Sequence, residues 1–197
     1  MYGERTTVNK TARSESRING VPVHSLYGLI DDIKAEPSLA RFQFRARNQW
    51  IDGGHTRSTV KNFYGAGRER HGRHRPFVLE SDLPAVFNGG NTAINPLESL
   101  LSAVGACLTT TIVYQASARG IYVDAVECSV EGEIDLRGFL GLDEDVSLGY
   151  EEVRMSVSIE ADVTEVELDS LVSMGERYSP VIGMLRPNTR IIVERIV

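Results

Sequence analysis

The sequence predicts an α+β fold in which strands and helices do not alternate as βαβ units. Two-periodic segments come first, a long apolar helix lies near the middle, and strands, a second helix and a last strand complete the 197 residues. Parallel strands need a crossover between them, so this order favours antiparallel sheets around the long helix. We expect a domain over residues 41–197, preceded by an N-terminal arm and short helix over residues 1–40.

The N-terminal region is predicted to be an arm followed by an amphipathic helix. Residues 1 to about 20 are polar and end at Gly20, so we expect a poorly ordered arm without a functional site. From Ser25 to about Ala35, four apolar residues recur at helical spacing, which predicts a short helix packed on a larger surface. These residues are Leu26, Leu29, Ile30 and Ile33.

A β-hairpin is predicted next, with a basic loop after it. The period-two pattern from Arg41 to about Phe63 is broken by Gly53 and Gly54. The stretch from Gly65 to Arg75 contains RERHGRHR, which is too polar and glycine-interrupted to be buried. Within it, His71 and His74 have a spacing that could suggest a metal, but adjacent arginines would repel a cation, so we expect a surface loop and no metal. A strand resumes over residues 77–79.

The strongest helix signal extends from Asn95 to Gly120. Asn95 is a suitable cap, Pro96 occupies the favoured first position, Glu98 completes a capping box, and Gly120 provides the stop. Apolar residues surround most of the helix, which predicts that it is buried. They are Leu97, Leu100, Leu101, Val104, Ala106, Cys107, Leu108, Ile112 and Val113.

The last third of the chain predicts an antiparallel strand pair, two helical segments and a closing strand. Residues 121–136 and 153–160 alternate between apolar and polar side chains, as half-exposed antiparallel strands do. Residues 138–141 lie in the connection between them. Further helical segments are expected from about Glu165 to Arg177 and from Ser179-Pro180, and a strand over residues 189–197.

Charge and composition describe an ordinary globular chain. The formal net charge is -6 and the pI is near 5.3, which argues against a whole-protein surface for nucleic acid or anionic membrane. The N-terminus has no apolar core of a signal peptide, and no stretch approaches 18 uninterrupted apolar residues. We therefore expect a cytoplasmic protein.

The two cysteines differ in their surroundings. A cysteine is reactive as its thiolate, which requires a positive neighbour, a helix N-terminus or a hydrogen bond to sulfur. Cys107 is expected to be buried midway along the central helix, where the helix dipole gives little help, so either a side chain brought in by folding activates it or it merely packs. Cys128 lies between Val126 and Val130 on the apolar phase of a strand, which favours packing.

Three motifs resemble the OsmC/Ohr family. NPLESLLSAVGACLTTT is similar to its central-helix signature, EIDLRGFLGLDEDVSLGYEEV to the strand-loop-strand region of OsmC-like members, and RYSPVIGML to the later helix start where peroxidase members carry Cys-Pro-Val. Together the motifs extend the resemblance over roughly residues 41–197. The resemblance implies an OsmC-like fold and an intertwined homodimer, with a central helix pair wrapped by two sheets and active sites at the subunit interface.

The resemblance also implies roles for individual residues. In peroxidase members a first cysteine reduces an organic hydroperoxide, a second cysteine resolves the sulfenic acid, and an arginine with a glutamate activates the first thiolate. Cys107 matches the first cysteine, and Arg57 is our choice for the arginine, with His55 as the neighbouring option and a solvated hairpin charge as the alternative. Ser179 replaces the second cysteine and cannot form a disulfide, so an external thiol must act unless Cys128 moves.

The glutamate role transfers poorly. In peroxidase members it directly follows Asn-Pro, where this chain has Leu97, and Glu98 lies one place later. Glu98 and Cys107 are separated by about 2.5 turns and roughly 14 Å of rise, on opposite faces of a straight helix. Either a partner subunit or a bent chain brings a carboxylate near the thiol, or Glu98 is only the capping residue.

The leading functional hypothesis is a thiol peroxidase with the single peroxidatic cysteine Cys107, acting on a small organic hydroperoxide without a cofactor. The alternative is a catalytically silent homodimer that holds an apolar ligand at its interface. A weaker option is acyl transfer through Cys107 or Ser179, since no histidine stands in a recognisable relation to either residue.

Overall fold

The N-terminal end of the described chain is a small hairpin attached to the central helix. The computed structural model describes residues 17–186 and 190–196. β1 (Arg17–Ile18) pairs with β2 (Val21–Pro22). The expected arm is therefore folded from residue 17, and the rest of that prediction lies outside the described residues. Asn19 explains the attachment, because its side chain donates to Ser117 Oγ and the carbonyl of Ile121, and accepts from the amide of Val123.

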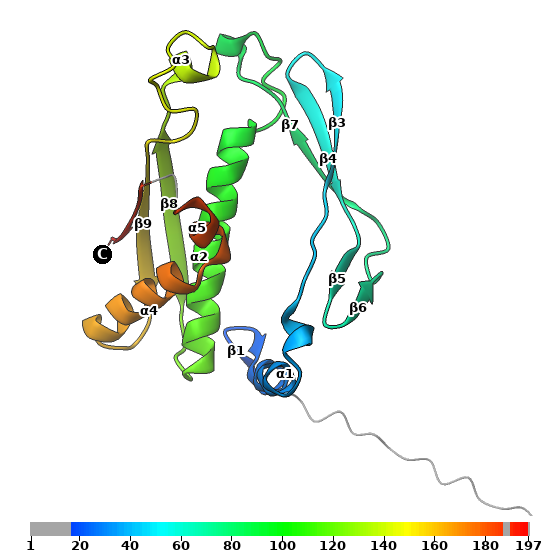
Figure 1. Ribbon diagram of the computed structural model, residues 1–197. Helices are drawn as coiled ribbons and strands as arrows, with labels where there is room; N and C mark the ends of the chain where they lie inside the picture. The colour runs from blue at the N-terminus through cyan, green and yellow to red at the C-terminus, as the bar shows by residue number, and fades with distance from the viewer. Residues whose placement is uncertain (1–16, 187–189, 197) are drawn as a thin grey trace, which may run out of the picture.

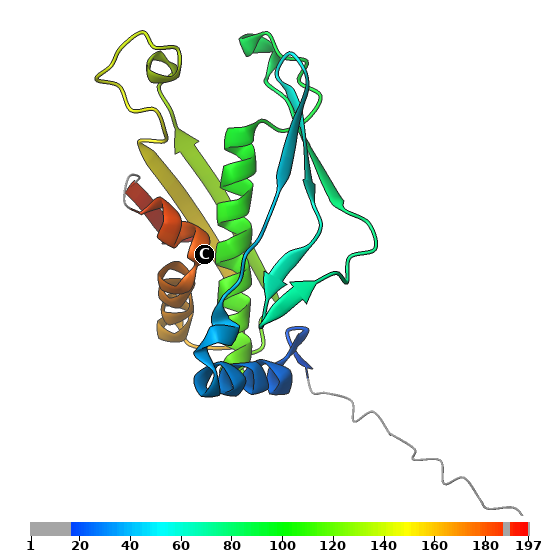
Figure 2. The ribbon, with the colours of Figure 1, turned by 45° about the vertical axis from the view of Figure 1, so that its right-hand side comes forward.

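α1 (Val23–Ala35) confirms the predicted amphipathic helix and begins two residues earlier. It lies across the lower end of the central helix, and Tyr27 Oη donates to the carbonyl of Ala118 at 2.6 Å (Figure 2). No residue of α1 is buried, so the expected packing on a larger surface is incomplete within one chain. A 3-10 turn, η1 (Pro37–Ala40), and extended residues lead from it to the first sheet.

The predicted hairpin belongs to a three-stranded antiparallel sheet in the order β3-β4-β7. Its strands are β3 (Arg47–Asp52), β4 (His55–Val60) and β7 (Phe77–Ser81). A second hairpin, β5 (Phe63–Gly65) and β6 (Arg68–Arg70), follows β4. The first part of the predicted basic loop is therefore strand, because arginines on a two-stranded hairpin can remain in solvent. Figure 1 shows the β3-β4-β7 sheet on the side of the central helix away from β8 and β9.

α2 (Pro96–Ala118) begins with the predicted capping box, in which Asn95 accepts from the amide of Glu98 and Glu98 accepts from the amide of Asn95. The expectation of burial all round is wrong for the single chain. Its buried residues Val104, Gly105, Leu108, Ile112 and Ala116 follow one side, and Ser117 is buried where the N-terminal hairpin bonds to it. Other α2 residues, including Tyr114, are exposed. α2 also has the length and apolar composition of a membrane span, and it is the central helix of this fold.

The C-terminal half covers the buried side of α2. β8 (Ala125–Glu133) and β9 (Glu152–Glu160) form the predicted antiparallel pair, and β10 (Arg190–Arg195) joins β9 in parallel. α3 (Leu136–Phe139) lies in the connection between β8 and β9. A 3-10 turn, η2 (Ala85–Phe87), precedes α2. α4 (Glu165–Tyr178) and α5 (Pro180–Leu185) pack on α2. The α+β class with sheets around a long central helix is confirmed.

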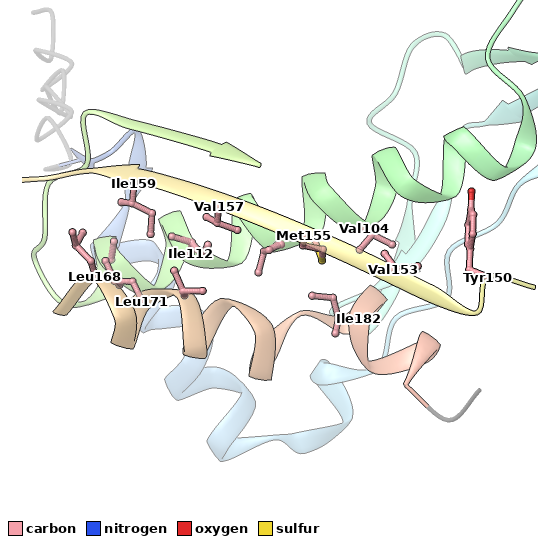
Figure 3. Close-up of a cluster of buried hydrophobic side chains, with 13 residues drawn as sticks. Val104, Ile112, Tyr150, Val153, Met155, Val157, Ile159, Leu168, Leu171 and Ile182 are labelled. Carbon is pink, nitrogen blue, oxygen red and sulfur yellow. The ribbon is translucent and has the colours of Figure 1, made fainter. Parts of the chain in front are cut away.

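The core lies between α2, β9, α4 and α5 (Figure 3). Each fully buried aliphatic side chain contributes roughly 1.5–3 kcal/mol. Gly175 lets α4 approach α2 closely, because a Cβ there would lie 2.5 Å from Ile112 Cγ1 and 2.9 Å from Leu108 Cδ1. The largest fully buried side chains are Leu108, Ile112, Met155, Leu171, Ile182, Val104, Val153, Val157 and Ser117. This core fixes α2 and therefore the position of Cys107.

Candidate functional site

Cys107 is half-buried at the margin of the buried side of α2, one residue before the fully buried Leu108. It is less buried than the sequence predicts, because α2 is covered on one side. The carbonyl of Cys107 accepts from Thr111 Oγ1 at 2.7 Å. Within residues 17–186 and 190–196, no hydrogen bond or ion pair reaches its sulfur. The described part of one chain therefore places a partly exposed cysteine on α2, and no cation bonds to its sulfur there.

Cys128 contacts a different side of α2 from the side that carries Cys107. Its Sγ is 4.0 Å from the point where a Cβ on Gly105 would be. Residues 105 and 107 are about 200° apart around a helix, so β8 holds Cys128 far around α2 from Cys107. Burial raises the pKa of the Cys128 thiol. Cys128 therefore packs as an un-ionised thiol, and a bridge to Cys107 would require β8 to move.

Ser179 is the residue that the resemblance aligns with the second cysteine of peroxidase members. It is 2% exposed and caps α5, where its Oγ accepts from the amide of Ile182 at 3.4 Å. The hydroxyl therefore has a structural use at the start of this helix.

Two adjoining grooves follow the exposed side of α2 beside β8. The first has a volume of about 480 Å³ and the second about 650 Å³, and both are lined by Thr109. Cys128 lines the first, together with Leu101, Ala106 and Val130. The lining of the second includes Val21, Val113, Val123 and Val126. Cys107 is not among the lining residues of either groove, so these hollows lie beside the other cysteine.

Glu98 also lines the first groove. Its Oε2 accepts from the amide of Asn95 at 2.8 Å, which confirms the capping interaction. Burial raises the pKa of Tyr150, and the charge of Glu98 adds to this effect. Glu98 therefore faces the groove and Tyr150, while its catalytic role stays a prediction.

Arg57 and His55 meet on a carboxylate that the sequence did not reveal. Arg57 Nε donates to Glu80 Oε1 at 2.6 Å, and His55 Nε2 lies 2.9 Å from Glu80 Oε2. Hydrogen bonding from Arg57, and then from His55, lowers the pKa of Glu80 despite some desolvation. The predicted strand ended at Leu79, and only the register between β4 and β7 places Glu80 opposite Arg57.

This cluster belongs to the β3-β4-β7 sheet, whereas Cys107 belongs to α2 (Figure 1). Neither Arg57 nor His55 bonds to the sulfur in the described part of the chain. The structure therefore holds Arg57 and His55 together on the carboxylate of Glu80, apart from the candidate nucleophile Cys107. No group of three metal-ligating side chains occurs among the described residues.

Comparisons with known proteins give the family. The model of the OsmC-like protein family matches residues 89–194, more than half of the chain. An OsmC-like protein from Mycoplasma pneumoniae has a similar structure, with a TM-score of 0.60 and 16% identity over 78% of this chain and 96% of that one. An organic hydroperoxide resistance protein OsmC from Legionella pneumophila has a TM-score of 0.56 and 17% identity, covering 79% and 97%.

The organic hydroperoxide resistance protein OhrB of Bacillus subtilis has a TM-score of 0.51 and 19% identity, covering 78% and 98%. At these identities the structural likeness shows the fold. A search of curated proteins found no match. Since the family model covers the whole central helix and the C-terminal half as far as residue 194, the chain belongs to the OsmC-like protein family.

Proposed function

We propose that this protein reduces small organic hydroperoxides through Cys107 and an external thiol. The observation that carries the proposal is the partial exposure of Cys107 on the central helix of an OsmC-like fold. Two structural neighbours that are named organic hydroperoxide resistance proteins give further support. We also propose a cytoplasmic location and a domain that begins at residue 41.

The proposed cycle needs one protein thiol. The Cys107 thiolate attacks one peroxide oxygen, the O–O bond breaks, and the alcohol leaves after protonation while the sulfur becomes a sulfenic acid. An external thiol then displaces water and forms a mixed disulfide. A second external thiol releases Cys107 and leaves as part of a small disulfide. The serine at position 179 and the distant Cys128 both favour this external route.

The activating cation is proposed to come from a second copy. Thiolate character requires a positive neighbour, and the described part of one chain brings none to the sulfur. Arg57 and His55 share one face of the β3-β4-β7 sheet with the exposed Val78, while Trp50, Phe77 and Leu79 lie on the opposite face. A homodimer in which the face of Arg57 and His55 covers the partner's α2 would bury Val78 and bring Arg57 or His55 to Cys107. Glu80 would then position both cations, in place of Glu98.

A silent binding protein is the second candidate function. The lining of the grooves beside β8 includes valine, leucine and alanine side chains, which suit an apolar ligand, together with polar groups such as Glu98 and Asp124 that could orient it. In this alternative Cys107 packs without reacting, and a partner copy closes the grooves.

Trapping of the sulfenic acid tests the proposal. The reduced protein is mixed with cumene hydroperoxide and dimedone, and peptides are analysed by mass spectrometry. We expect dimedone on Cys107 in the native protein and in Cys128→Ser, and none at this position in Cys107→Ser. The native protein and Cys128→Ser should also consume peroxide steadily when dithiothreitol is present. An unmodified Cys107 at millimolar peroxide would leave the binding alternative.

A further inference from the structure

Charge is segregated along this chain, although the net charge of -6 conceals it. Residues 41–75 contain nine arginines or lysines and two acidic residues. Residues 135–151, which connect β8 to β9, contain five acidic residues and one arginine. One segment is therefore strongly basic and another acidic, which the whole-chain charge cannot reveal.

The basic segment forms a surface that is also aromatic. The ring of Phe42 stacks with those of Phe44 and Phe63, with centroids 5.9 and 6.4 Å away, and Phe44 and Phe63 are tilted against each other at 5.5 Å. The guanidinium of Arg73 lies over Phe63 at 5.4 Å and over Phe77 at 5.0 Å. The pairing of β5 with β6 aligns Phe63 with Arg70 and Gly65 with Arg68, so both arginines belong to the face of Phe63. We call Phe42, Phe44, Phe63, Phe77, Arg68 and Arg73 the basic aromatic surface.

The acidic connection presents apolar side chains to solvent. Phe139, Leu140, Leu142 and Leu148 are 70%, 60%, 71% and 75% exposed. Ion pairs hold the loop in this conformation, because Arg137 pairs with Asp135 and Asp143. A Cβ at Gly138 would lie 2.7 Å from the carbonyl oxygen of Ser147, so the backbone fills the loop interior. We call residues 135–151 the acidic apolar loop.

The two features complement each other in charge and in polarity. An exposed group of large apolar side chains is unfavourable in water and marks a contact surface. The acidic apolar loop offers aliphatic groups beside carboxylates, and the basic aromatic surface offers rings beside guanidinium groups. In both ribbon views, α3 lies at one end of the molecule while β5 and β6 lie toward the other (Figures 1 and 2). The loop therefore does not cover the surface of its own chain.

We propose that the acidic apolar loop of one copy docks on the basic aromatic surface of a second copy. The contact deepens the homodimer of the proposed function by naming the segments that meet. It does not require Cys107 to react. A nucleic acid would satisfy the arginines but would leave the aliphatic side chains of the loop exposed, so a second copy accounts for both features. Attraction between the charges is screened by salt over about 10 Å, so the association weakens as ionic strength rises.

Charge reversal tests this contact in the full chain. One variant carries Glu144→Lys and Asp145→Lys in the loop, and the other carries Arg68→Glu and Arg73→Glu in the surface. A control carries Glu160→Lys and Asp162→Lys at the far end of β9. Sedimentation velocity at low salt should show self-association weakened by at least about tenfold in each test variant and unchanged in the control. Circular dichroism verifies that each variant is folded.

Mixing the two test variants provides the decisive measurement. In a mixed dimer, each loop again faces a surface of opposite charge, so native mass spectrometry should detect heterodimer in preference to either homodimer. A variant Phe139→Ser with Leu142→Ser, which changes no charge, should also weaken association. A monomeric native protein, wild-type affinity in both reversed variants, or no gain on mixing would each overturn the proposal. Tight binding of a monomer to single-stranded oligonucleotide would also overturn it by assigning the surface to a polyanion.

The two proposals fail separately. Dimedone labelling of Cys107 together with charge-insensitive dimers would refute the loop contact alone. A mixed dimer that forms as expected while Cys107 stays unlabelled would refute the peroxidase proposal alone.

Discussion

Arg57 and Glu80 are directly opposed on β4 and β7, with Arg57 Nε 2.6 Å from Glu80 Oε1. His55 contacts the other carboxylate oxygen, so one acidic group holds both candidate cations of the first hairpin. The cluster is partly exposed, and ion pairs of this kind stabilise a fold only weakly. Its arrangement therefore points to positioning of the cations more than to stability.

Glu80→Gln should make the protein less sensitive to acid. Since the cations lower the pKa of Glu80, its stabilising contribution is fully present above about pH 4.5 and is lost as the pH falls through the lowered value. The native melting temperature should thus decrease more between about pH 5 and 3 than that of Glu80→Gln. Thermal melts followed by circular dichroism provide the measurement. Glu160→Gln, at an exposed position on the end of β9, should retain the native profile. Coincident profiles for the native protein and Glu80→Gln would contradict the prediction.

Gly175→Ala should destabilise the fold by about 1–3 kcal/mol, because its methyl group would overlap Ile112 and Leu108 in the core. Chemical denaturation gives the free energy of unfolding. Gly183→Ala is the matched control, since no atom lies within 4 Å of its added Cβ in α5. Its helix propensity should make it neutral or more stable by about 0.5–1 kcal/mol. Similar free energies for the two variants would show that α2 and α4 are not in close contact at Gly175.

Local sequence signals predicted the helices and strands better than they predicted the tertiary contacts of those elements. The capping box of Asn95 and Glu98 lies within one turn, and the alternation in β8 and β9 is visible along each strand, so both were predictable. The exposed side of α2 was not, because an apolar circumference does not tell which side the same chain covers. Glu80 was missed because its partner depends on strand register. The ordered hairpin at Asn19 was missed because its contacts are about a hundred residues away in sequence.

Asn19→Ala should destabilise the attachment of the N-terminal hairpin. The variant loses three side-chain hydrogen bonds to α2 and the residues after it, each worth about 0.5–1.5 kcal/mol. Asn91→Ala is a suitable control, because Asn91 has the same positive φ of 52 degrees. The backbone strain of the two alanine variants should be similar, so Asn19→Ala should cost about 1.5–4.5 kcal/mol more. Hydrogen exchange at residues 17–22 should accelerate, and equal losses in both variants would assign the effect to the backbone.

Cys128 should react slowly with alkylating reagents near neutral pH. Burial raises its pKa above the ordinary value of 9.0, so its thiolate fraction is small in the folded protein. In Cys107→Ser, where Cys128 is the remaining cysteine, we expect the iodoacetamide rate to reach its midpoint above about pH 9. The same chain in denaturant provides the control, because burial is then lost and the midpoint should decrease. Equal midpoints in the folded and unfolded chain would show that the sulfur is solvated, and Cys128 would become a candidate for resolving the sulfenic acid of Cys107.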